Sequence, residues 1–215
     1  MRKQLGWRIL FYFIGVNCMA LGTTLNSKTG LGLSPVTSLP NSVAQLLNIR
    51  FSVAVFVLYC LMVLVQFLMK GKNRNWWDLL QLPTSLLFSS YLELFGTLLP
   101  FSFPRISQNL LMMVVGTCIT GIGVSLSVNM DIAPNPPDGL VYTASKMFRR
   151  DMGLMKNILD AICLLAAVMI DMISSGGLRS TGIGTLWNMI FIGRTVSVVD
   201  RFFKEKIRRL AGLQE

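Results

Sequence analysis

The sequence contains no histidine, and only 14% of its 215 residues are charged. The absence of histidine excludes histidine-based catalytic triads, histidine metal ligands and histidine proton switches. A soluble domain has about 25% charged and 45–50% apolar residues, whereas 53% of this chain is hydrophobic. Its four cysteines lie inside apolar runs without a C-x-x-C pair, so they predict neither a zinc site nor a disulfide framework. The composition predicts a membrane protein with no metal and no cofactor rather than a soluble enzyme.

Six stretches reach the roughly 20 mostly apolar residues that a spanning helix needs. They lie at residues 8–26, 52–69, 79–99, 109–128, 152–173 and 182–200. The first follows Arg2 and Lys3, as in a signal peptide, but it is too long for a typical signal core, and we expect it to be retained. The sequence therefore predicts an all-α, polytopic fold with six transmembrane helices in a single membrane domain, residues 1–215.

The basic residues predict the orientation of these spans. With the N-terminus in the cytoplasm, 14 of the 20 Lys and Arg residues fall in cytoplasmic segments and 4 fall outside, as the positive-inside rule requires. Trp7, Trp76 and Trp77 then lie at the cytoplasmic interface, which favours amphipathic rings. Both termini are predicted to be cytoplasmic. The basic tail, residues 201–215, is interpreted mainly as a topology signal, with contact to anionic membrane lipid as the alternative. The basic residues that give the net charge of +10 lie between apolar runs, so no nucleic-acid partner is expected.

The two halves of the chain align when one is shifted by 101 residues without gaps. The aligned identities are Gly15/Gly116, Gly22/Gly123, Leu25/Leu126, Pro35/Pro136, Leu39/Leu140 and Thr84/Thr185. Repeat 1 covers about 8–100 and repeat 2 about 109–201. Because each repeat has three spans, an odd number, the second must enter the membrane from the opposite side, as in many secondary transporters. The paired glycines are interpreted as close packing between the first and fourth spans.

A short proline-initiated helix is predicted after the first span of each repeat, at 35–48 and 136–149. Ser34 and Asn135 are N-cap residue types, and each precedes a proline at the first helical position. Fourteen residues reach about 21 Å, which is too short to cross a core of about 30 Å. These segments either lie on the membrane surface or enter it and return. Their symmetric occurrence favours re-entrant half-helices whose N-termini meet at the midplane, where free backbone N–H groups favour an anion or a carboxylate.

We therefore predict a polar, solute-binding pocket in the membrane interior. Its predicted residues are Ser34, Pro35, Thr37, Ser38, Asn135, Pro136, Asp138, Gly139, Thr84 and Thr185. Three charges, Asp160, Arg194 and Glu93, are expected inside spans, where charge is costly unless it is paired or hydrated. Asp160 and Arg194 have similar predicted depth, so we expect them to pair or to face the pocket together, with Lys156 competing for Asp160. Such a pair could be a structural clamp or a part of the transport mechanism.

The sequence resembles the YczE/YyaS/YitT family of bacterial membrane proteins, and its YczE-like branch in particular. The segments that carry the resemblance are LGLSPVTSL, NPPDGL and GIGTLWNMIFIG at 182–193, in this order along nearly the whole chain. The resemblance implies a multi-pass protein of the bacterial cytoplasmic, or inner, membrane and implies no substrate. Thr37 stands where the second repeat has Asp138, and Arg194 stands where the family more often has small or apolar residues.

Three functions are compatible with this pattern. The first is a small secondary transporter or permease for a small, anionic or zwitterionic solute bound at the half-helix tips. The second is a membrane accessory or regulatory protein that transports nothing, and the third is a channel. An enzyme is not expected, because no nucleophile–base pair or metal cluster is visible. A homodimer or a partner membrane protein is compatible with each function.

Overall fold

The computed structural model describes residues 2–73, 75–100 and 104–213, so Arg74 and the last two residues of the predicted basic tail lie outside the described residues. Within those ranges the chain forms eight α-helices, two short 3-10 helices and no strand, which confirms the predicted all-α class. The α-helices are α1 (Arg2–Thr29), α2 (Pro35–Leu47), α3 (Phe51–Lys70), α4 (Gln81–Leu98), α5 (Ile106–Val128), α6 (Pro136–Phe148), α7 (Met152–Ser175) and α8 (Ile183–Leu210). The 3-10 helices, η1 (Gly71–Asn73) and η2 (Trp76–Leu80), connect α3 to α4.

In the part of the chain that the structure describes, four helices are long and apolar enough to cross a membrane: Gln4–Thr29, Phe51–Lys70, Ile106–Val128 and Met152–Ser174. They correspond to the first, second, fourth and fifth predicted spans. The third and sixth predicted spans also form helices, α4 and α8, but these do not combine the required length and apolar composition. Large apolar side chains face outward, among them Leu68 at 70% exposure and Ile173 at 80%. The chain is therefore a helical membrane protein.

Helix α1 packs along α5 more extensively than any other pair of helices in the described chain. Glycines at the crossing allow this approach. A Cβ atom added to Gly116 would lie 2.9 Å from the carbonyl oxygen of Gly22, and one added to Gly123 would lie 2.6 Å from the carbonyl oxygen of Gly15. The interpretation of these glycines as packing residues between the first and fourth spans is confirmed.

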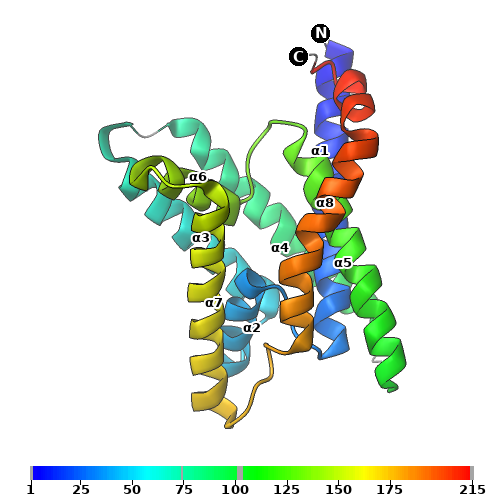
Figure 1. The fold of residues 1–215 in the computed structure, drawn as a ribbon, viewed down its shortest axis with the longest axis vertical. Coiled ribbons are helices and arrows are strands. Elements are labelled where there is room, and N and C mark those ends of the chain that lie inside the picture. The colour runs from blue at the N-terminus through cyan, green and yellow to red at the C-terminus, as the bar shows by residue number, and fades with distance from the viewer. Residues whose placement is uncertain (1, 74, 101–103, 214–215) are drawn as a thin grey trace.

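The remaining helices exchange partners between the two halves of the chain. The short helix α2 packs against α7, and the short helix α6 packs against α3. Helix α1 also packs on α4, as α5 does on α8. The correspondence is incomplete, and the largest difference is that α3 packs firmly on α4 whereas α7 and α8 scarcely touch. Figure 1 shows α7 and α8 apart, and it shows both ends of the chain at the same end of the molecule.

Helix α8 continues about ten residues beyond the predicted end of the sixth span, through the first part of the basic tail. Its Lys, Arg and Glu residues are good helix formers, and basic side chains in the last turn suit the helix dipole. The added length docks near the start of α1: Arg208 Nη1 lies 3.0 Å from Asp131 Oδ2, and Arg8 Nη2 donates to the Met130 carbonyl at 2.9 Å. The segment is thus a helical extension that is mostly exposed and is held near the start of α1 at its far end.

Candidate site: a cavity at the tips of the two half-helices

A cavity of about 420 Å³ lies where the N-termini of α2 and α6 approach each other. Fourteen of its 21 lining residues form seven pairs in which the two members are 101 positions apart in the sequence. The pairs are Met19/Thr120, Thr23/Val124, Ser34/Asn135, Val36/Pro137, Thr37/Asp138, Tyr59/Asp160 and Phe88/Met189. The two halves of the chain therefore contribute corresponding positions to one cavity.

The tip of α2 forms a neutral part of the lining. Ser34 has extended backbone angles and Pro35 begins the helix, as predicted. The Ser34 side chain does not cap the helix, however, because its hydroxyl is hydrogen-bonded to the Thr37 hydroxyl at 2.8 Å. The Ser34 carbonyl accepts from the backbone N–H of Ser38 at 2.8 Å, which starts the helical ladder. This tip presents hydroxyl groups and the positive end of a helix dipole to the cavity.

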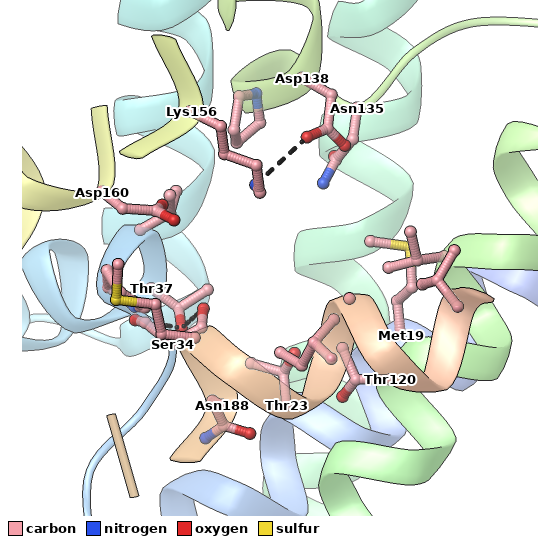
Figure 2. A pocket seen from close by; sticks show the side chains of 18 of the residues that line it. Met19, Thr23, Ser34, Thr37, Thr120, Asn135, Asp138, Lys156, Asp160 and Asn188 are labelled. Carbon is pink, nitrogen blue, oxygen red and sulfur yellow. Dashed lines mark hydrogen bonds and ion pairs between the residues drawn. The ribbon is translucent and has the colours of Figure 1, made fainter. Parts of the chain in front are cut away.

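The tip of α6 and the facing side of α7 contribute the charges. Asp138, in the first turn of α6, forms an ion pair with Lys156 of α7, whose Nζ lies 3.5 Å from Asp138 Oδ1. Figure 2 shows this pair on one side of the cavity and Asp160 projecting into the cavity from α7. Asp160 is only 6% exposed. Within the described chain it makes no hydrogen bond and no ion pair within 4 Å, although Lys156 attracts it and Asp138 repels it electrostatically. The cavity therefore holds two carboxylates and one ammonium group.

An aromatic wall adjoins these charges. Tyr59 of α3 and Phe88 of α4 are buried, with stacked rings whose centroids lie 5.8 Å apart. Met19 and Met189 also line the cavity. The cavity therefore combines a polar, charged side with an apolar, polarisable one, as small-molecule binding sites typically do.

A buried amide of α8, Asn188, also lines the cavity. Asn188 is 1% exposed, and its Oδ1 accepts from the Thr117 hydroxyl at 2.6 Å and from Asn26 Nδ2 at 3.4 Å. The Asn188 Nδ2 group is buried without a protein partner in the described chain. A polar group of a bound solute could accept a hydrogen bond from this donor, because buried amide N–H groups are rarely left without an acceptor.

Of the ten predicted pocket residues, Ser34, Pro35, Thr37, Asn135 and Asp138 line the cavity. Ser38 lies behind the tip, fully buried, and donates to the carbonyls of Ser34 at 3.0 Å and Ser180 at 3.2 Å. Helical geometry turns successive residues to different sides, so Ser38 cannot share the direction of Thr37.

The other four predicted pocket residues are also outside this lining. Pro136 is buried, and Gly139 packs on α3 and α4, where an added Cβ would lie 2.7 Å from Gln81 Oε1. Thr84 lines a much smaller neighbouring cavity together with Asn135. Thr185 accepts from the Gly182 backbone N–H at 3.2 Å and fixes the start of α8. None of the four touches the main cavity.

The predicted pairing of Asp160 with Arg194 is wrong. Asp160 lines the cavity, but Arg194 is exposed and lies over the ring of Phe191, 5.4 Å from its centroid. The error arises because similar depth on consecutive helices does not make them neighbours, and α7 packs on α2 instead of α8. Glu93 also lies outside the cavity, with its Oε1 3.1 Å from Arg50 Nη1.

Several lining residues were missed from the sequence. Tyr59 could have been found by applying the 101-residue shift to Asp160, whereas Thr120 and Phe88 correspond to Met19 and Met189, which had not been singled out. Asn188 carried a different signal, an amide within an apolar run, which is unfavourable in lipid unless it has a partner. Across the described residues, no three carboxylate or thiol side chains come together as a metal site requires.

A comparison with protein-family models matches residues 6–201 to a family of unknown function, DUF6198. No curated protein and no solved structure matches the chain.

Proposed function

The chain belongs to the family of unknown function DUF6198, and we propose that it is a small secondary transporter, or permease, of the bacterial cytoplasmic membrane. Its solute binds in the cavity at the tips of α2 and α6. One observation carries the proposal: the two half-helix tips share a cavity of about 420 Å³, and corresponding positions of the two halves line it. A midplane site between inverted repeats is the usual arrangement of secondary transporters.

The exchange of helix partners supports an inverted repeat. A two-fold axis relating the halves would interchange α2 with α6 and α3 with α7, and the packing of α2 on α7 mirrors that of α6 on α3. The close α1–α5 contact would then lie on the axis. The pairing of lining residues at a constant offset gives independent support, because it follows from sequence positions rather than from helix contacts.

A six-span topology accompanies this proposal. Helices α4 and α8 are the third and sixth spans beside the four strongly apolar ones. At 1.5 Å per residue the 18 residues of α4 reach about 27 Å, close to the thickness of the hydrocarbon core. Their lower hydropathy suits helices that face a polar cavity. Both termini lie at the same end of the molecule, as an even number of crossings requires, and the basic residues favour the cytoplasmic side.

The loose contact between α7 and α8 supports a moving part. Helix α8 lines the cavity through Asn188, Ile192 and Val196 but is scarcely held by α7. Displacement of α8 against α5 would open and close that side of the cavity, as alternating access requires. A non-transporting accessory protein needs no such cavity, so a solid apolar core at the tips would have favoured that role. The relation to the YczE-like branch stays a prediction.

Uptake into proteoliposomes tests the proposal. Purified protein is reconstituted and offered labelled small anions, zwitterions and amines, with and without a proton or sodium gradient. Val196→Trp should abolish uptake of any accepted solute, because Val196 lines the cavity. Val198→Trp is the matched control on the same helix, because Val198 is 56% exposed. Equal uptake by both variants, or no uptake above protein-free liposomes for the whole panel, would contradict the proposed transport.

A further inference from the structure

We infer that the solute carries a positively charged amine, which binds at Asp160. This inference rests on the proposed function of the cavity and specifies the chemistry of its ligand. It departs from the anion that two helix N-termini alone would favour, because the side chains around the tips alter the charge of the site.

The first argument is the charge of the cavity. Among the described residues that line the cavity, Lys156 is the one ammonium group, and its Nζ lies 3.5 Å from Asp138. Asp160, a residue only 6% exposed, has no hydrogen bond or ion pair for its carboxylate in the described chain. An ionised carboxylate removed from water is strongly destabilised unless a cation compensates it. One positive charge from a ligand would balance the two carboxylates against the ammonium group.

The second argument is the wall beside Asp160. Tyr59 is the position equivalent to Asp160 in the first half of the chain, and its ring stacks on Phe88. Aromatic faces attract organic cations, and the polarisable thioethers of Met19 and Met189 suit an alkyl-substituted ammonium group. A cavity lined by hydroxyls alone would favour a hydrated inorganic ion. This lining favours an organic one.

The third argument is the size and polarity of the remaining space. A volume of about 420 Å³ is within the range of small-molecule pockets, roughly 300–1,000 Å³, and far exceeds a single dehydrated ion. The tip of α2 carries hydroxyl groups and no charged side chain, whereas at the tip of α6 the Asp138 carboxylate offsets the positive end of the helix dipole. A polar or carboxylate end of the solute would therefore lie at Ser34 and Thr37, with the amine end at Asp160.

Binding to the purified protein in detergent tests the inference without requiring transport. Isothermal titration calorimetry is run with choline, ethanolamine, glycine betaine, acetate and sodium chloride. We expect saturable binding of at least one of the three organic ammonium compounds, which are called amines below for short, and none of acetate or sodium. Asp160→Asn should weaken that binding roughly ten- to hundredfold, as expected for the loss of a charged partner. Glu205→Gln, an equal charge change on the exposed part of α8, should leave it unchanged.

The outcomes separate this inference from the proposed function. Binding of acetate or sodium without any amine, or equal amine binding by wild type and Asp160→Asn, would overturn it. If Asp160→Asn does not fold, the wild-type panel still decides, because the inference fails when none of the three amines binds. Amine binding without uptake into proteoliposomes would retain the inference and reject transport. Uptake of an anion without amine binding would do the reverse.

Discussion

The close crossing of α1 and α5 predicts that a single methyl group at Gly22 destabilises the protein. In Gly22→Ala the new Cβ would lie 2.5 Å from the carbonyl oxygen of Gly116 and 2.7 Å from the backbone nitrogen of Thr120, and closer still to the Thr120 hydroxyl. Two of these three neighbours are backbone atoms of a helix, so they can move only if the helices separate. Overpacking of this kind costs roughly 1–3 kcal/mol.

Gly6→Ala provides the matched control in the same helix, because no atom of the described residues lies within 4 Å of a Cβ at Gly6. Both substitutions gain the helix preference of alanine, about 0.5–1 kcal/mol, so their difference isolates the clash. At about 2–4 °C per kcal/mol, thermal unfolding in detergent should place Gly22→Ala roughly 2–12 °C below Gly6→Ala. Gly123→Ala should behave like Gly22→Ala, because its Cβ would lie 2.5 Å from the Met19 nitrogen. Equal unfolding temperatures for the Gly6 and Gly22 variants would refute the close crossing of α1 and α5.

Three further predictions follow from the structure. Single cysteines replacing Arg105 and Arg179 should react with an impermeant maleimide from outside the cell, as six spans require, whereas crossing by the four strongly apolar helices alone would place both inside. Asp171→Ala should lower the free energy of unfolding by about 3 kcal/mol and loosen α2. The buried Asp171 carboxylate accepts from the backbone N–H groups of Arg179 and Ser180 at 3.0 and 2.8 Å, and the Ser180 carbonyl accepts from the Ser38 hydroxyl of α2. An unfolding temperature equal to that of Glu205→Ala would contradict this role. Lys156→Met should strengthen amine binding and Asp138→Asn should weaken it, since the first removes a competing cation and the second frees Lys156 for Asp160; calorimetric affinities that shift in the opposite directions would contradict the assigned charges.

The starts of the two half-helices were predictable to the residue. Pro35 and Pro136 begin α2 and α6 as expected, because a fixed φ angle and a missing N–H suit the first helical position wherever the helix lies. The short lengths of the two helices were also predictable. Each helix ends one residue before its predicted last residue, and that residue, Asn48 or Arg149, has a left-handed conformation.

Contacts between helices were not predictable in the same way. Asp160 was correctly expected inside a span, but its neighbours depend on which helices pack together and on the rotation of each about its axis. Apolar spans in lipid carry only a weak amphipathic signal, so nothing in α7 indicated that it packs on α2 instead of α8. The 101-residue shift did predict one feature of the cavity, namely that corresponding positions of the two halves line it. The shift relates every position of the first half to one of the second, and not only the positions with identical residues.

The exchange of helix partners between the halves has a consequence for how the protein is made. Helix α2 is covered by α7, which begins about 100 residues later in the chain, so at roughly 5–20 residues per second it waits about 5–20 s for its partner. Ser38 and Ser42 are completely buried in the finished structure. During that interval, the helices already synthesised do not provide the contacts that finally bury them. The packing around α2 is therefore completed only after α7 has been made, and the first half of the chain cannot reach its final packing on its own.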